Sequence, residues 1–285
     1  MAAGMVGPIW RRLLSAGGFQ GAVVPRTKSL GTESIAGVGA SVFVDEAFAE
    51  NELNDPRPGL NGRVTGSQLG QGSLAFSRER IAEANSSGGV NVAILTARWN
   101  PELVDEAEIN DTRLTLSGAF SEAHAGYRFE RVLIELIDAQ DRRWASAIPF
   151  IRIHAEFPGG TRALALVEKS NLEANQATVL AQHFSCPLPR LFLRASDQEL
   201  LLAALDNPTD EWLTRELGLT KEAVKRRWSV LFERIDREMP ELFESMKADD
   251  RSVRGPQKRH VVLAYVRKHP QELRPFARAV QANAR

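Results

Sequence analysis

The stretch Thr209–Ile235 constrains the fold most, because it has the pattern of two short helices joined by a tight turn. Thr209 or Asp210 is a suitable N-cap for the first helix, and Gly218 is a suitable end for it. Thr220 is a suitable N-cap for the second helix. Only a short turn fits between the two. Two short amphipathic helices around a glycine-containing turn predict a helix-turn-helix motif.

The second of these helices has an apolar face and a polar face. Val224, Trp228 and Leu231 recur at helical spacing, so we expect them to point inward. The opposite face is mostly basic and suits the DNA major groove, where Lys and Arg meet phosphates and guanine edges and Glu can accept from cytosine. An ordinary solvated helix face is the alternative. The candidate DNA-binding residues are Thr220, as the cap, with Lys221, Glu222, Lys225, Arg226, Arg227 and Ser229.

Four short motifs lie before or within this helix pair. The polar run Ser196–Glu199 precedes the apolar run Leu200–Leu205, and Leu-Gly-Leu-Thr at 217–220 and Ala-Val-Lys at 223–225 follow. Together they resemble the C-terminal helix-turn-helix of the LuxR-type family of bacterial transcriptional regulators. The resemblance implies double-stranded DNA as a partner, and it leaves open a homodimer and an unidentified small-molecule ligand.

Charge patterning suggests a second contact to DNA. The chain of 285 residues has a formal net charge of +0, so no global field draws it to nucleic acid or membrane. Basic residues gather instead between Arg251 and Arg274. Within that segment, Lys258 and Arg259 are candidates for phosphate contacts beside the groove. A helical cap that completes the core of a small domain is the alternative.

The single cysteine, Cys186, excludes an intrachain disulfide and a multi-cysteine metal site. One cysteine fits a reducing, cytoplasmic setting. No apolar run approaches the roughly 18 residues needed to span a bilayer. We therefore expect a cytoplasmic protein with no membrane partner, no metal and no cofactor.

The N-terminal half alternates strand and helix patterns. Apolar runs predict a hairpin from Phe19–Val24 and Ile35–Val44, a buried strand over Val90–Ala97, and paired strands over Ala147–His154 and Arg162–Val167. Between them we expect a long helix from Asn100 to about Ala125 and a second helix over Tyr127–Ile137. This order predicts an α+β or α/β sensor-like domain, either PAS/GAF-like or acyltransferase-like, followed by an all-α helix-turn-helix domain.

An enzyme is the main alternative to DNA binding. The run Ile35–Val44 resembles the central strand of acetyltransferase-type folds, which implies an acyl-coenzyme A-dependent acyltransferase in the N-terminal half. Such an enzyme needs a phosphate-cradling loop before a helix, and Arg63–Gln68 is the nearest candidate. His124, Tyr127 and Arg128 lie close together, but a helix C-terminus explains them better than a catalytic pair. No catalytic residue is assigned.

The sequence therefore predicts four segments. These are an N-terminal region with a β-hairpin over 1–60, a sensor-like domain over 61–184, a linker over 185–195 and the LuxR-type domain with its basic extension over 196–285. The function that follows is a DNA-binding transcriptional regulator, whose N-terminal region senses a signal or mediates dimerisation. A protein-interaction module, in which the helix pair recruits another protein, is the third alternative.

Overall fold

The computed structural model describes residues 18–27, 33–69, 77–172, 180–247 and 255–277. The chain forms two compact units, Met1–Ser185 and Cys186–Arg285. Each unit has hydrophobic clusters of its own. Within the described segments, no helix combines the length and the apolar character needed to cross a bilayer.

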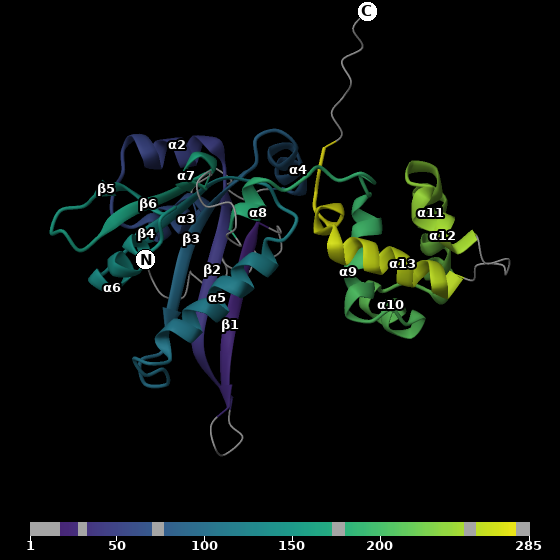
Figure 1. Cartoon of the computed structure of the whole chain (residues 1–285), viewed down its shortest axis with the longest axis horizontal. Coiled ribbons are helices and arrows are strands. Elements are labelled where there is room, and N and C mark those ends of the chain that lie inside the picture. The colour runs from purple at the N-terminus through teal and green to yellow at the C-terminus, as the bar shows by residue number, and fades with distance from the viewer. Residues whose placement is uncertain (1–17, 28–32, 70–76, 173–179, 248–254, 278–285) are drawn as a thin grey trace, which may run out of the picture. The chain divides into compact units, whose positions relative to one another are not determined.

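The first unit is built on one mixed sheet of six strands, seen in Figure 1. β3 and β4 run parallel, and the other neighbouring pairs are antiparallel. Helix α5 (Ile109–Ala123) lies in the crossover that a parallel pair requires. Side by side, the strands are β1 (Phe19–Thr27), β2 (Glu33–Val44), β3 (Val90–Trp99), β4 (Phe129–Leu136), β6 (Ala163–Glu168) and β5 (Arg152–Glu156).

Both faces of the sheet are covered, because successive side chains along its central strands enter different clusters. In β3, Val92 belongs to one cluster and Ala93 to the other. The first cluster includes residues of α4 (Arg78–Ser86), α5 and α8 (Ala181–Phe184). The second includes residues of α2 (Glu46–Asn54) and α3 (Leu60–Leu69). The unit therefore has helices on each side of its sheet.

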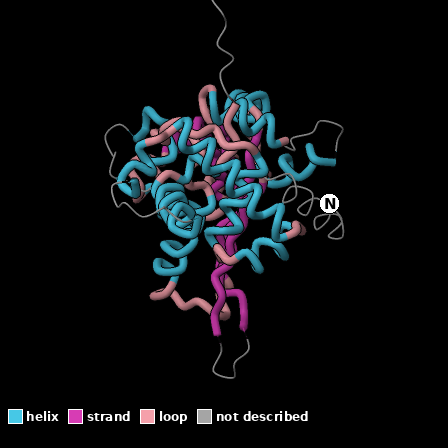
Figure 2. Tube along the Cα trace, turned by 90° about the vertical axis from the view of Figure 1, so that its right-hand side faces the viewer, coloured by secondary structure: helices cyan, strands magenta, loops and turns pink. Residues whose placement is uncertain are grey.

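Strands β1 and β2 form a ribbon that extends beyond the helices covering the rest of the sheet, as Figure 2 shows. Val23 and Ile35 on this ribbon are 61% and 55% exposed. The hairpin predicted from Phe19–Val24 and Ile35–Val44 is confirmed, and so is the pairing of the strands on either side of Gly159. The first strand of the later pair begins only at Arg152.

Two predicted helices differ from the structure. The prediction of a helix over Tyr127–Ile137 is wrong, because Phe129–Leu136 forms strand β4. Phe129, Val132, Leu133 and Leu136 have helical spacing, but a central strand buried on both faces also carries a nearly continuous apolar run. The long helix expected from Asn100 begins only at Ile109, as α5, and turns fill the intervening residues.

The second unit is helical in its described residues 186–247 and 255–277. Its cluster includes Leu200, Leu213, Trp228 and Val262, which come from four different helices. The helices are α9 (Ala195–Asp206), α10 (Asp210–Leu217), α11 (Lys221–Glu238), α12 (Glu241–Lys247) and α13 (Gly255–Lys268), followed by the 3-10 helix η2 (Pro270–Leu273).

The predicted fold class is wrong. A PAS/GAF-like or acyltransferase-like domain was expected, but the hairpin and the later strands belong to one six-stranded mixed sheet within the first 170 or so residues. Helices follow this sheet, yet they are not shown to be the predicted all-α helix-turn-helix domain. Instead, α10 and α11 share one core with α9, α12, α13 and η2.

Candidate functional site

The turn between α10 and α11 is fixed by local hydrogen bonds. Thr209 caps α10 by accepting from the Trp212 amide over 3.4 Å. Gly218 adopts φ 62°, the left-handed conformation that ends many helices. The Leu219 amide then donates to Thr214 O over 3.0 Å. Thr220 caps α11 by accepting from the Ala223 amide over 3.2 Å. Helix α10 therefore ends, and helix α11 begins, where the sequence predicted the turn.

Helix α11 buries one face and exposes the other. Val224, Trp228, Leu231 and Ile235 are all buried in the core of the second unit. The cap Thr220 is exposed, and Arg227 is half-buried at the edge of the helix. The exposed face presents most of the predicted DNA-binding residues together, namely Lys221, Glu222, Lys225, Arg226 and Ser229.

The charges on this face are not all equally available. The Lys221 ammonium lies 3.2 Å from Glu211 Oε1 of α10. A hydrogen bond to its own backbone amide, together with Lys221, holds the pKa of Glu211 below its usual value. Lys225 and Arg226 form no ion pair with any residue in the described part of the chain. These two side chains are therefore the cations on α11 that are most accessible to an anionic partner.

Lys258 and Arg259, the two predicted contacts from the basic segment, lie on α13 and pack within the unit. Arg259 Nη1 donates to Asp210 Oδ1 over 2.6 Å, and its guanidinium lies 5.0 Å from the centre of the Trp228 ring. The Lys258 ammonium lies 5.0 Å from the centre of the Phe243 ring. Both cations contact aromatic rings of the core, an arrangement that favours attraction to the ring faces.

Two buried carboxylates connect separate segments of this unit, and neither was predicted from the sequence. Asp197 of α9 accepts from Arg234 Nη1 of α11 over 2.7 Å, with both side chains nearly inaccessible. Glu272 of η2 is fully buried. It accepts from the Arg190 and Leu191 amides, at 2.8 and 3.0 Å.

Tyr265 of α13 also donates to Glu272 Oε1, over 3.0 Å. Burial first, and then the negative charge of Glu272, raise the pKa of Tyr265 well above its usual value. An acidic residue seven positions after a tyrosine gives no recognisable sequence signal. These contacts fix η2 and the chain before α9 to α13.

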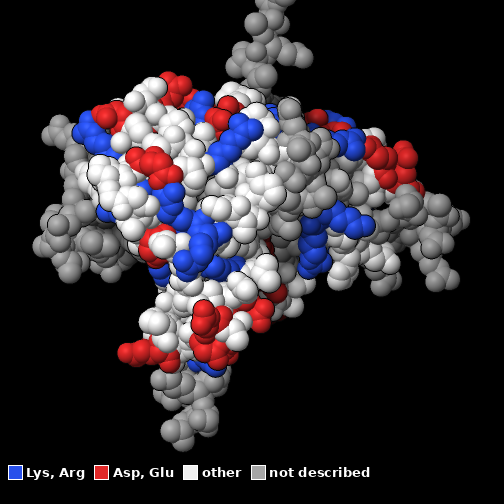
Figure 3. Space-filling view, turned by 60° about the vertical axis from the view of Figure 1, so that its left-hand side comes forward, with Lys and Arg blue, Asp and Glu red and all other residues white. Residues whose placement is uncertain are grey.

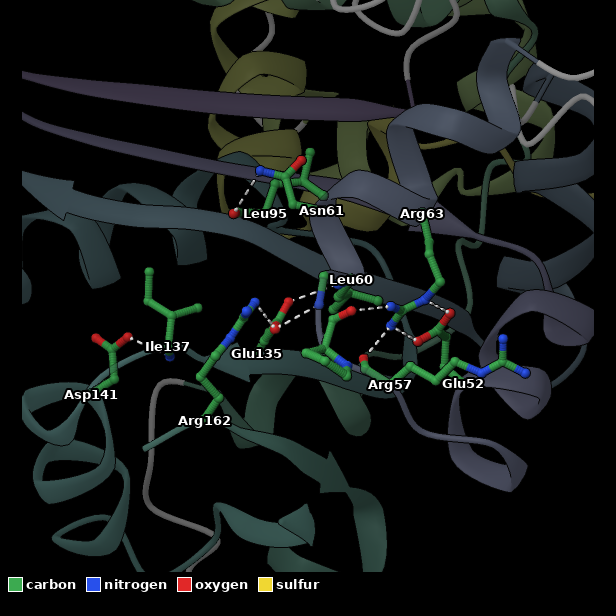
Figure 4. A network of polar contacts seen from close by, with 12 residues as sticks. Glu52, Arg57, Leu60, Asn61, Arg63, Leu95, Glu135, Ile137, Asp141 and Arg162 are labelled. Carbon is green, nitrogen blue, oxygen red and sulfur yellow. Dashed lines mark hydrogen bonds and ion pairs between the residues drawn. The ribbon is translucent and has the colours of Figure 1, made fainter. Parts of the chain in front are cut away.

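A charged crevice lies at the carboxyl ends of the parallel strands β3 and β4. There Glu135 accepts from the Gly59 and Leu60 amides at the start of α3, over 2.8 and 2.7 Å, and from Arg162. Figure 4 shows this network, in which Arg63 also pairs with the buried Glu52.

In the same crevice, Asp141 of α6 (Ala139–Ser146) accepts from both terminal nitrogens of Arg98 and from the Ile137 amide. Its charge and that of Glu135 are therefore compensated inside the unit, so the network secures α3 and α6 to the sheet. Figure 3 shows both signs of charge on the face that it presents, with basic side chains gathered near its middle and acidic side chains gathered toward its lower end.

His124, which was considered for enzyme chemistry, is buried in the first unit and held by hydrogen bonds. His124 Nδ1 donates to Phe120 O over 2.7 Å, and Ser41 Oγ lies 3.1 Å from Nε2. Ser41 and His124 are each 1% exposed, and a backbone carbonyl stands where a catalytic triad has a carboxylate. The segment Arg63–Gln68 lies inside α3, so it does not form the loop before a helix that an acyl-coenzyme A site requires.

A search of protein-family models matches none to the chain, and a search of curated proteins finds no match either. The resemblance of residues 196–235 to LuxR-type regulators therefore stays a prediction.

Proposed function

We propose that the chain is a cytoplasmic, LuxR-type DNA-binding transcriptional regulator that reads duplex DNA with the exposed face of α11. Its N-terminal unit would sense a signal or mediate dimerisation. The observation that carries the proposal is the exposure of Lys225 and Arg226, which stand beside the buried Val224 and Trp228 on the same helix. A basic helix face held rigidly by its apolar side is the arrangement with which helices enter the major groove.

Charge is distributed unevenly along α11, which supports this orientation. Residues 221–229 contain four basic side chains and one acidic side chain, whereas residues 230–238 contain two basic and three acidic ones. The positive end of the helix dipole also lies at Thr220. Phosphates are therefore attracted to the first half of the helix, and we expect this half to contact the DNA.

Binding and its charge dependence test the proposal. Sites are selected from random duplexes with the full chain, and affinity for the best site is then followed by fluorescence anisotropy at several salt concentrations. We expect the double variant Lys225→Ala, Arg226→Ala to bind at least about tenfold more weakly. The slope of log affinity against log salt should also fall by roughly 0.9 for each phosphate that the variant no longer neutralises.

A matched control removes the same charge from elsewhere in the unit. Arg267 and Lys268, in the last turn of α13, are exposed, and their replacement by alanine lowers the net charge by the same amount. We expect this control to retain the affinity and the preferred sequence of the unmodified chain. Equally weakened binding in the two double variants would refute the role of α11, and failure to enrich any sequence would refute DNA reading altogether.

A further inference from the structure

The N-terminal unit contains an apolar cavity of about 430 Å³ between α5 and the sheet. Ile94 of β3 and Ile134 of β4 form part of its floor, and Phe120 of α5 lines the opposite side. Trp144 and the segment 147–151, which connects α6 to β5, line it further. Ligand sites typically occupy about 300–1,000 Å³, so the volume suits a small molecule.

The chemistry of the wall restricts what the cavity can hold. Among its described lining residues none is charged, and Ser117 and Ser121 supply the only side-chain hydroxyls. A carboxylate or ammonium group placed there would lose water without gaining an opposite charge. A hydrocarbon or aromatic body loses nothing of this kind and packs favourably against Phe120, Trp144 and Phe150. The wall therefore selects for a neutral, mainly apolar ligand.

One end of the cavity is polar. Ser121 is buried, its hydroxyl accepts from Gln182 Nε2 over 3.0 Å, and it lies 3.0 Å from His183 Nε2. The His183 ring stacks on Phe129 with 4.7 Å between the ring centres, which fixes its position. A ligand with one uncharged hydrogen-bonding group can place that group beside Ser121 or Ser117 and its apolar body against the sheet.

The large side chains along this wall are incompletely packed. Phe120, Trp144 and Phe150 each pack against the buried cluster yet remain only partly buried. Protein interiors normally reach the packing density of organic crystals, and large apolar side chains that could collapse into a space usually do so. Here the sheet fixes one wall and the crossover helix α5 fixes the other.

We propose that this cavity binds a neutral small molecule with a mainly hydrocarbon or aromatic body and one uncharged hydrogen-bonding group. The inference relies on the proposed function only for the role of that molecule as a signal. Binding itself takes place within the first unit, where the lining residues all lie.

A neutral fluorescent probe tests the site. N-phenyl-1-naphthylamine is titrated into the full chain without DNA, and its fluorescence should rise and saturate at one probe per chain. Decanol and decanoate, which share a chain length, are then used as competitors. We expect decanol to displace the probe at a concentration at least about tenfold lower than the concentration of decanoate that is needed, because the wall offers no partner for a carboxylate. Equal competition would overturn the assignment of a neutral ligand.

Two tryptophan substitutions locate the binding. Ala147 and Ser146 are both exposed, but only Ala147 lines the cavity. Ala147→Trp should weaken probe binding about tenfold or more by filling the space, and Ser146→Trp should leave it unchanged. Thermal unfolding of both variants checks that they fold. Equal probe binding by both variants, or a signal that never saturates, would refute the site.

The two proposals can fail separately. Retained probe binding with no enrichment of DNA would refute only the regulator, and sequence-selective DNA binding with no probe signal would refute only the cavity ligand.

Discussion

Arg259 of α13 donates to Asp210 Oδ1 of α10 over 2.6 Å while its guanidinium lies 5.0 Å from the centre of the Trp228 ring of α11. One side chain therefore joins three helices. Its exposed fraction is 18% and that of Asp210 is 17%, so water screens the ion pair only partly. The sequence left open whether this residue contacts DNA phosphates or belongs to a helical cap of the domain, and its contacts give it a clear part in packing the unit.

Arg259→Ala should destabilise the second unit by about 2 kcal/mol, because it leaves Asp210 without its cation and removes the guanidinium from the Trp228 ring. Hydrogen exchange in peptides from α10 and α13 measures the destabilisation. Arg267→Ala, at an exposed position on α13, should change stability by less than about 0.5 kcal/mol. Unchanged exchange in Arg259→Ala, combined with weaker DNA binding, would favour a phosphate contact instead.

The residues that begin and end helices α10 and α11 could be predicted from the sequence, because their interactions span only a few residues. Thr209 and Thr220 each cap the start of a helix, and Gly218 ends one. Each acts through neighbours at most five positions away, so these roles can be predicted from the sequence. The contacts of Arg259 and Glu272 could not be read in this way. Arg259 meets Asp210 across 49 positions, and Glu272 meets Arg190 across 82. Such pairings depend on how helices pack.

The first unit shows a different limit. Strand β4 carries Val132, Leu133 and Ile134 in succession, and all three are buried because helices cover both faces of the sheet. A continuous apolar run is compatible with either a helix or a central strand, so periodicity alone could not decide between them. The apolar cavity was also hidden, since its wall comes from β3, α5, β4, α6 and β6.

Gly218→Ala should destabilise the α10–α11 pair by roughly 1 kcal/mol, because an L side chain is strained at φ 62°. A Cβ there meets no atom within 4 Å, so the cost is conformational and not steric. Gly66→Ala, inside α3 and with equally open space around its Cβ position, should instead stabilise by about 0.5–1 kcal/mol. Urea unfolding of both variants measures the two changes, and the same sign in each would contradict the argument.

Alkaline pH should weaken the second unit through Tyr265. Burial and Glu272 raise the pKa of its hydroxyl in the folded state, while the unfolded chain should have the usual pKa of about 10. Below that pH both states keep the proton and the contribution is complete. Above it only the unfolded state releases the proton, so stability falls as pH rises toward the folded pKa.

The substitution Tyr265→Phe removes this titration. We expect the variant to be less stable than the unmodified chain near neutral pH, because it lacks the hydrogen bond to Glu272, but its stability should decline less between about pH 9 and 11. Tyr127→Phe, at the other tyrosine of the chain, is the control. Urea unfolding at each pH gives the comparison. A decline as steep in Tyr265→Phe as in the unmodified chain would show that another group is responsible.

Substitution of Glu222 distinguishes recognition of base edges from electrostatic attraction to phosphates. It is the acidic residue on the otherwise basic first half of α11, and it is exposed beside Lys225 and Arg226. If it accepts from a cytosine edge, Glu222→Ala should relax selection at one base pair by about 1–3 kcal/mol. Affinity for unrelated duplexes should rise at the same time, because a negative charge near the phosphates is removed.

Anisotropy titrations of Glu222→Ala on the selected site, on single-base variants of it and on an unrelated duplex measure both effects. Glu233→Ala, an exposed acidic position in the second half of α11, is the matched control and should leave the base preference unchanged. Higher affinity for every duplex with unchanged preference would mean that Glu222 acts only through its charge. Lower affinity for every duplex would mean that α11 does not face DNA in the proposed orientation.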